Sequence, residues 1–169
     1  TAVNRIDDFA YTPEQNIAHS MTALMAQNKG AGKKNRMQEG FRCGMVLESI
    51  YGIFIFLVCF IFAKPLMCLF VQDEEVIMHG VTYLHLISIM YILPAFTNGI
   101  QGFFRGIGDL KITLISSLVN MTVRVIVAAP LVFSLHLGIE ALPYSYLAGW
   151  IGMLMAELPL LIRTYKAYE

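Results

Sequence analysis

The sequence predicts an all-α membrane protein: a polytopic bundle of five transmembrane helices in a single membrane domain, residues 1–169. Of its 169 residues, 57% are hydrophobic and only 14% are charged, and the mean hydropathy is +0.62. Soluble domains are usually about a quarter charged. Apolar runs of about 20 residues, the length that crosses a bilayer, recur at 43–62, 81–104, 112–135 and 141–162. A lipid bilayer is therefore the expected environment.

The first segment, about 2–28, has the periodicity of a helix but is too polar to face lipid. Apolar residues recur at steps of three and four, and an opposite stripe carries Asp8, Gln15 and His19. Such a helix lies on a membrane surface or spans inside a bundle with its polar face on a water-filled cavity. We favour the cavity and place the three residues on a substrate or cation pathway.

The other helices are expected at about 37–63, 74–104, 109–135 and 141–166. Lys64-Pro65 should stop the second helix, the acidic run from Asp73 should open the third, and Pro94 should kink it. The glycine-rich stretch 102–109 is predicted to be a water-facing turn, with Asp109 placed to cap the helix that follows.

Small residues on the helix faces predict close helix packing. Gly44 and Gly52 fall on one face of the second helix, and Gly152 lies in a similar seam of the last. Glycine at such spacing lets neighbouring helices approach closely. Glu48 and Glu157 lie near the cytoplasmic ends of the same helices, where we expect them to snorkel to water or pair with arginine.

Polar residues inside the apolar runs are further candidates for the transport pathway: Asn98, Gln101, Asn120 and Arg124. Arg124 falls near the bilayer midplane, where arginine costs about 2.5–3.5 kcal/mol on insertion scales and should face a partner or a cavity. We expect it to be held by Glu14, by Gln15 or by a counterpart outside this chain. A purely structural ion pair or helix–helix hydrogen bond is the alternative.

Basic residues alternate between the connections. Nine of the twelve Lys and Arg residues fall in the turn after the first helix, the turn after the third, and the C-terminal segment. Cytoplasmic loops collect such residues, so the C-terminus is expected in the cytoplasm. Five spans then put residue 1 outside, and we expect at least one further helix to precede this chain.

Two turns carry a family resemblance. Gln27-Asn28-Lys29-Gly30-Ala31-Gly32 resembles the "QN-x-GAG" signature of multidrug and toxic compound extrusion (MATE) transporters, and Arg105-Gly106-Ile107-Gly108-Asp109 resembles their "RG-x-GD" turn. The order of elements fits the second lobe of that fold without its first helix.

The resemblance implies part of an antiporter in the cell (plasma or inner) membrane. Such proteins export drug-like organic cations and amphiphiles in exchange for Na⁺ or H⁺ by alternating access between two lobes. The implied partners are a small amphiphilic substrate and the N-terminal lobe. No nucleic-acid partner, enzymatic activity or cofactor other than the coupling ion is expected.

One helix departs from the family pattern because it lacks an acidic residue. Part of the family has a coupling acid in the helix matching 80–104, where this sequence has none; Asn98 and Gln101 hydrogen-bond but carry no exchangeable charge.

A lipid-linked saccharide flippase of the same superfamily and a non-transporting membrane assembly subunit are the alternatives. An intramembrane metalloenzyme is disfavoured because the four histidines form no closely spaced pair.

Overall fold

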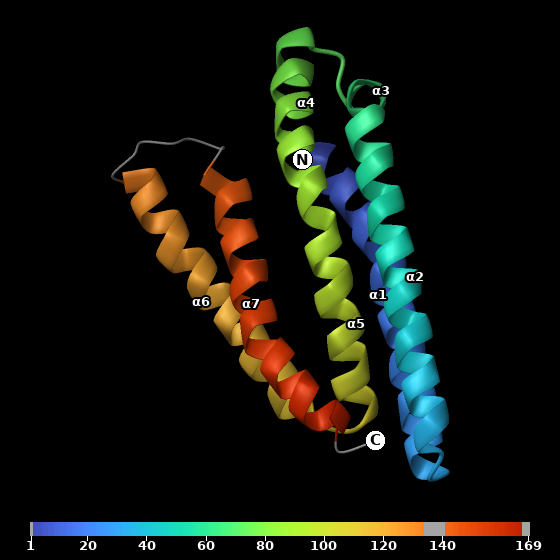
Figure 1. Ribbon diagram of the computed structural model, residues 1–169. Coiled ribbons are helices and arrows are strands. Elements are labelled where there is room, and N and C mark those ends of the chain that lie inside the picture. The colour runs from blue at the N-terminus through green and yellow to red at the C-terminus, as the bar shows by residue number, and fades with distance from the viewer. Residues whose placement is uncertain (1, 134–140, 167–169) are drawn as a thin grey trace.

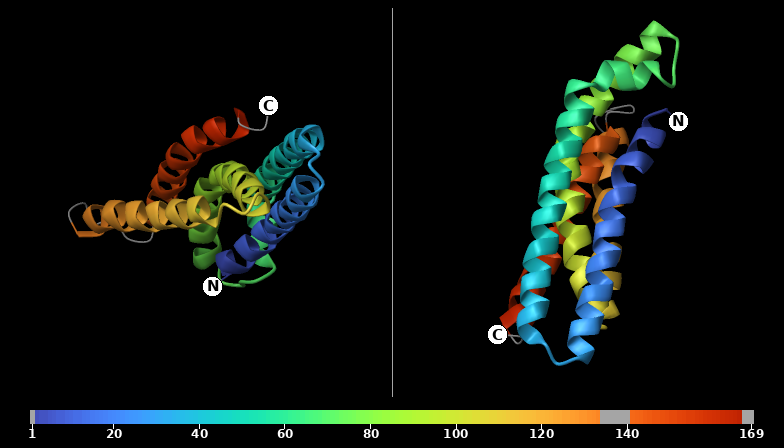
Figure 2. Two further views of the ribbon diagram at one scale, coloured as in Figure 1. Left: turned by 90° about the horizontal axis from the view of Figure 1, so that it is seen from below. Right: turned by 90° about the vertical axis from the view of Figure 1, so that its right-hand side faces the viewer.

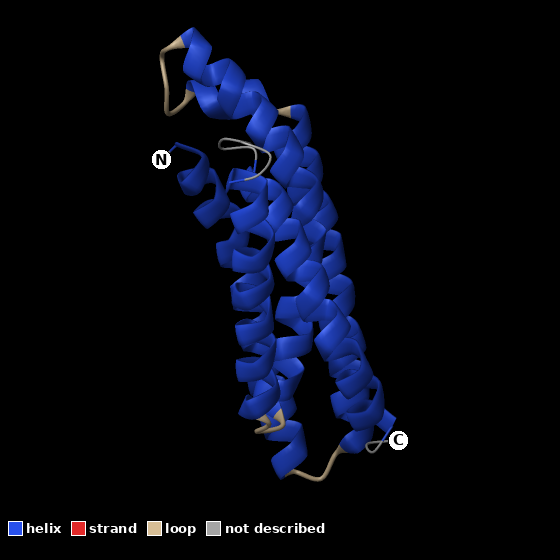
Figure 3. Ribbon diagram, turned by 90° about the vertical axis from the view of Figure 1, so that its left-hand side faces the viewer, coloured by secondary structure: helices blue, strands red, loops and turns tan. Residues whose placement is uncertain are grey.

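The computed structural model describes residues 2–133 and 141–166, and every regular element within them is helical (Figures 1 and 3). The predicted all-α fold is therefore confirmed. The last two residues of the helix expected at 109–135 lie outside the described residues. In chain order the elements are α1 (Ala2–Gly30), α2 (Lys34–Ile61), α3 (Ala63–Cys68), α4 (Glu74–Ser88), the 3-10 turn η1 (Ile89–Tyr91), α5 (Ile92–Gly106), α6 (Leu110–Phe133) and α7 (Ala141–Lys166).

Four helical stretches of the described chain are long and apolar enough to cross a bilayer: Lys34–Ile61, Glu74–Gly106, Leu110–Phe133 and Ala141–Lys166. The predicted membrane helix bundle is thus confirmed. The expected count of five spans is approximate, because α1 has 29 residues but is too polar to qualify. It packs lengthwise against α2 and α5.

The helices form two groups. α1, α2, α4 and α5 pack together, while α6 and α7 pack chiefly on each other as a hairpin (Figure 1). The hairpin meets α5 near the C-terminal end of the molecule and diverges from the other helices toward the opposite end (Figures 1 and 2). One buried apolar cluster surrounds Leu84 and Tyr91. A second surrounds Met25, Phe103 and Phe104.

The third predicted span is interrupted at its proline. α4 ends at Ser88, the 3-10 turn η1 follows, and α5 begins two residues before Pro94. Proline has no N–H to donate to the preceding turn, and its ring crowds the carbonyl four residues earlier. The backbone tightens into a 3-10 turn just before it, as often happens where a helix is strained.

The end of the second helix differs from the prediction. Lys64-Pro65 does not stop α2, which already ends at Ile61; Pro65 instead lies in the first turn of the short helix α3. Proline is tolerated there because the N–H groups of a first turn have no helical partner. The acidic start of α4 is as expected: the Asp73 side chain accepts hydrogen bonds from the backbone N–H groups of Glu75 and Val76, at 3.0 and 3.1 Å.

The glycine-rich stretch 102–109 is mostly helix, so the turn predicted there is too long. α5 continues to Gly106, and only the last three residues connect it to α6. A Cβ atom at Gly102 would lie 2.7 Å from the carbonyl oxygen of Ala18, and one at Gly106 would lie 2.7 Å from that of Thr22. These glycines therefore allow the α1 and α5 backbones to touch.

The glycines proposed for packing lie at helix contacts. A Cβ atom at Gly52 would be 3.1 Å from Cβ of Ala95 in α5, and one at Gly152 would be 3.1 Å from Val123 in α6. Gly44 faces the side chain of Met21 in α1.

Candidate functional site

A polar pocket opens where the α6–α7 hairpin diverges from α1. Its volume is about 520 Å³, and it draws residues from α1, α4, α5, α6 and α7. We call it the main pocket; its lining consists of Asp7, Asp8, Tyr11, Gln15, Ile87, Asn98, Arg124, Tyr146 and Trp150. Polar groups inside an apolar bundle are retained where they face protein or water rather than lipid.

A smaller pocket of about 200 Å³ shares Asn98 and Trp150 with the main pocket. The rest of its lining comes from α5, α6 and α7: Gln101, Ser117, Asn120, Met121 and Met153. The two pockets therefore adjoin, with polar side chains in both and a more apolar lining in the smaller one.

The structure brings most of the proposed pathway residues together. Asp8, Gln15, Asn98 and Arg124 line the main pocket, and Gln101 and Asn120 line the smaller one. His19 is exposed on the polar face of α1 and lines neither pocket.

Arg124 is held by an aromatic ring and not by Glu14. Its guanidinium carbon lies 3.8 Å from the centroid of the Tyr146 ring, an arrangement in which the ring face attracts the cation. Of the three expected partners, Glu14 is excluded, because neither of its carboxylate oxygens completes a hydrogen bond in the described chain. Gln15 lines the same pocket as Arg124, and a counterpart outside this chain stays a prediction. Residues 14 and 15 are separated by about 100° around a helix of 3.6 residues per turn, so Gln15 reaches the main pocket while Glu14 points into the packed helices.

Asp7 lines the main pocket, although it was not among the residues that the sequence placed on the transport pathway. The structure places it half-buried at the wall of the main pocket. The hydroxyl of Tyr91, which is fully buried, donates a hydrogen bond to its carboxylate.

Glu14 and Glu48 form a buried pair of carboxylates between α1, α2 and α5. Their exposed fractions are 0% and 1%, and the two charges lie close enough to interact. Asn98 also interacts with Glu14, yet none of the four carboxylate oxygens completes a hydrogen bond within the described chain. Buried carboxylates without partners are strongly unfavourable, so this pair is suited to hold a proton or a small cation.

Glu157 lies in a second buried polar group. It is fully buried, and its Oε1 accepts a hydrogen bond of 3.3 Å from Nε2 of Gln101. The amide of Asn120 lies 3.6 Å from the Met153 sulfur in the same region. The expectation that Glu48 and Glu157 snorkel to water or pair with arginine is wrong. Both side chains are buried on faces covered by α5, and within the described chain the hydrogen bond that reaches their carboxylates comes from Gln101 and not from an arginine.

The two signature turns meet at one end of the molecule. The Lys29 ammonium group donates a hydrogen bond to the Ile107 carbonyl, and a pocket of about 660 Å³ lies between the turns. Gly32 and Gly108 have φ angles of +67° and +83°, a region that disfavours residues with a Cβ atom. Each turn thus contains a glycine that its backbone conformation requires.

Gly108→Ala is expected to destabilise the protein by about 1–2 kcal/mol, the penalty of the left-handed conformation for a residue with a Cβ atom. Thermal unfolding of the purified full-length protein measures the effect. Gly30→Ala is the matched control, because Gly30 ends α1 without a positive φ and, like Gly108, has nothing within 4 Å of an added Cβ. Equal melting temperatures for the two variants would contradict the expectation.

Across the described residues no three His, Cys, Asp or Glu side chains gather into a group that could hold a metal ion.

The fold and the site together define a multi-pass membrane protein with polar pockets inside its helix bundle. The model of the MatE family matches residues 1–131, which is more than three quarters of the sequence. The chain therefore belongs to the MatE family, as the two signature turns indicated.

A comparison with an individual protein agrees with this family assignment. The chain is 24% identical over 150 residues to "Probable multidrug resistance protein NorM" of Thermotoga maritima, a match that covers 88% of this chain and 31% of that protein. The chain thus spans about a third of the length of this curated relative.

Two solved structures share the fold at 15% identity. One is described as the inward-facing conformation of a multidrug resistance MATE family transporter, with a TM-score of 0.82 over 90% of this chain and 36% of that one. The other is the MATE transporter ClbM in complex with Rb⁺, with a TM-score of 0.81 over 99% of this chain and 42% of that one.

Proposed function

We propose that this chain is part of an antiporter that exports drug-like organic cations and amphiphiles by alternating access, driven by Na⁺ or H⁺. The observation that carries the proposal is the main pocket: Asp7, Asp8, Gln15, Asn98 and Arg124 gather inside a bundle that exposes many large apolar side chains elsewhere. The name of the Thermotoga relative, a probable multidrug resistance protein, supports the same function.

The pocket offers both polar and aromatic contacts to an amphiphile. Asp8 and Asp7 supply negative charge for an organic cation, while Tyr11, Tyr146 and Trp150 supply ring faces. Aromatic rings attract cations and pack against apolar groups. Few directional contacts and much adaptable apolar surface are typical of promiscuous binding.

Cation coupling is supported by the Glu14–Glu48 pair. None of its four oxygens completes a hydrogen bond within the described residues, so a proton or a monovalent cation bound there would relieve an unfavourable burial of charge. The complex of the structural relative ClbM with Rb⁺ shows that a protein of this fold holds a monovalent cation.

The proposed orientation places the basic end in the cytoplasm. The α1–α2 turn, the α5–α6 turn and the end of α7 lie together at that end (Figure 1), and they carry nine of the twelve Lys and Arg residues. By the positive-inside rule the C-terminus is cytoplasmic. The plasma or inner membrane is the location that the family resemblance implies.

The proposed partner of α1 is the N-terminal lobe of the full-length protein. The exposed face of α1 carries Asp8, Thr12, Gln15, Asn16 and His19, which lipid would not solvate. A second lobe across a water-filled cavity would cover this face and complete the binding site.

Transport by the full-length protein in liposomes tests the proposal. We expect a fluorescent organic cation to move against its gradient when an opposing Na⁺ or H⁺ gradient is imposed, and each gradient imposed alone identifies the ion. Uptake that ignores both gradients would contradict the coupling. Flipping of a lipid-linked saccharide without movement of the dye would favour the flippase.

Arg124→Gln is expected to reduce this transport by about tenfold or more, because a charged contact in a partly dehydrated pocket contributes about 1.5–3 kcal/mol and about 1.4 kcal/mol corresponds to tenfold. Arg124→Lys keeps the cation over Tyr146 and should retain more activity. Initial rates at matched amounts of folded protein measure both. Wild-type rates in Arg124→Gln would contradict the role of Arg124 in the pathway.

A further inference from the structure

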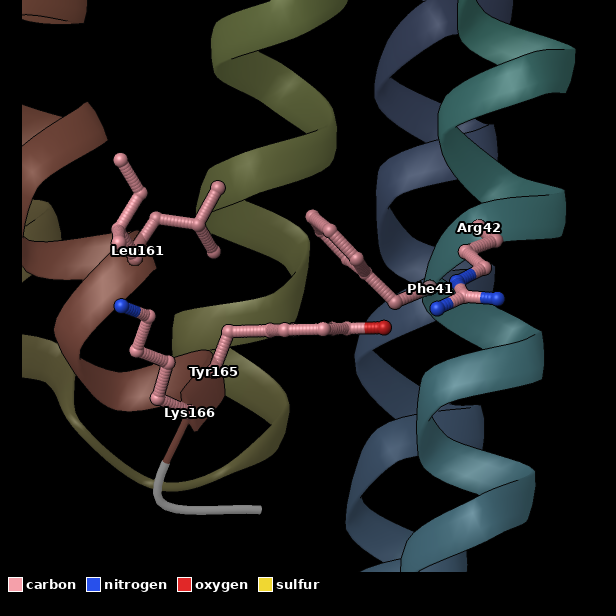
Figure 4. A pocket seen from close by; sticks show the side chains of 6 residues that line it. Phe41, Arg42, Leu161, Tyr165 and Lys166 are labelled. Atoms are coloured by element: carbon pink, nitrogen blue, oxygen red, sulfur yellow. The ribbon is translucent and has the colours of Figure 1, made fainter. Parts of the chain in front are cut away.

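An apolar groove lies between α2 and α7 at the basic end of the molecule, on a different side from the main pocket. Its volume is about 350 Å³, and Phe41, Leu161, Ile162 and Tyr165 form its apolar walls. The rings of Phe41 and Tyr165 meet across it, with their centroids 5.7 Å apart. In Figure 4 the Tyr165 ring extends from α7 toward Phe41 and forms the floor between them.

Two cations stand at the edges of this groove. Arg42 comes from α2 and Lys166 from α7 (Figure 4), and both side chains are exposed. Neither has an ion-pair or hydrogen-bond partner within the described part of the chain. The buried hydroxyl of Tyr165 also has no hydrogen-bond partner there. The groove therefore combines apolar walls with hydrogen-bond donors that have no partner in the described chain.

The position of the groove matches the headgroup level of a leaflet. Arg42 lies eight residues after the start of α2 and Lys166 is the last residue of α7. Beyond Arg42 the exposed side chains of α2 become apolar, beginning with Val46 and Leu47, and α7 exposes Leu158 and Ile162. This change from basic to apolar surface is the pattern of the boundary between headgroups and acyl chains.

We infer that this groove binds one anionic phospholipid of the leaflet at the basic end, with its phosphate between Arg42 and Lys166 and an acyl chain along Phe41, Leu161 and Ile162. Basic pockets between transmembrane helices bind anionic headgroups. The bound lipid would bridge α2 and α7. The inference does not depend on the transported substrate or the coupling ion.

Native mass spectrometry of the full-length protein with added phosphatidylglycerol or phosphatidylcholine tests the inference. We expect wild-type protein to retain phosphatidylglycerol in preference to phosphatidylcholine. The Arg42→Gln/Lys166→Gln variant should bind phosphatidylglycerol about 30-fold more weakly, since each basic residue near the surface contributes about 1 kcal/mol. Lys34→Gln/Arg36→Gln removes two cations from the same end outside the groove and should bind as wild type does.

Ile162→Trp tests the apolar half of the site, because it leaves both cations in place and occupies the groove from an exposed position. It should weaken phosphatidylglycerol binding, and thermal stabilisation by this lipid should fall in parallel. Equal binding of phosphatidylglycerol and phosphatidylcholine, unchanged binding in the Arg42→Gln/Lys166→Gln variant, or equal stabilisation by inorganic phosphate would each overturn the inference.

Discussion

Gly102→Ala is expected to separate α1 from α5 and to destabilise the protein by about 3 kcal/mol or more, the upper range for overpacking a core. The new Cβ atom would lie 2.7 Å from the carbonyl oxygen of Ala18. That oxygen belongs to the backbone of α1, so no side-chain rotation relieves the contact. The helices must shift, and the hydrogen bond from Thr22 Oγ1 to the Gly102 carbonyl, 3.2 Å long, would be lost with them.

Gly44→Ala provides the matched control for this substitution. Gly44 also lies at a contact with α1, but the atoms that its Cβ would meet belong to the side chain of Met21. Methionine is unbranched and adapts to altered packing, so we expect a loss of about 1 kcal/mol or less. Thermal unfolding of the full-length protein in detergent compares the two. A Gly102→Ala variant as stable as Gly44→Ala would show that α1 and α5 do not pack as described.

Replacing the buried carboxylate pair, Glu14→Gln with Glu48→Gln, is expected to reduce cation-driven transport strongly while the protein remains folded. The amides are nearly isosteric with the acids but carry no charge, so they remove the group proposed to hold the proton or cation. The fold should tolerate the change, because uncharged side chains are easier to bury than carboxylates without partners.

Two readouts separate coupling from substrate binding. Gradient-driven export should fall at least about tenfold, the size expected from losing one charge-dependent interaction. Exchange of labelled for unlabelled substrate at equal ion concentrations should persist, because the main pocket is unchanged.

Glu39→Gln changes an exposed carboxylate on the same helix α2 and should behave as wild type does. Full gradient dependence in the double variant would place the coupling ion elsewhere in the full-length protein.

The sequence predicted the helices better than their rotations. Apolar runs of spanning length and their breaks located the bundle, because lipid leaves few alternatives to a helix. The spacing placed Asp8 and Gln15 on the pocket face of α1, but it did not show that Glu14 faces α2. Glu14 and Gln15 are adjacent in sequence, and only the packing of Ala10 and Ala18 against neighbouring helices directs Glu14 inward and Gln15 toward the pocket.

Glycine was the other source of error. Gly102, Gly106 and Gly108 occur within seven residues and look alike in sequence, which suggested one turn. The structure assigns them different roles: the first two permit contact between helices, and the third has the positive φ of a turn. A missing side chain is compatible with both uses, so sequence alone does not separate them.

Because the α6–α7 hairpin contacts α5 near one end, a small rotation at that contact would move its far end by a large distance. α6 has 24 residues and is therefore about 36 Å long. A rotation of about 10° at the end where it meets α5 would move its far end by about 6 Å, while side chains near the contact with α5 would hardly shift. A modest swing of this arm would thus widen or narrow the mouth above Arg124 without rebuilding the tightly packed contacts below it.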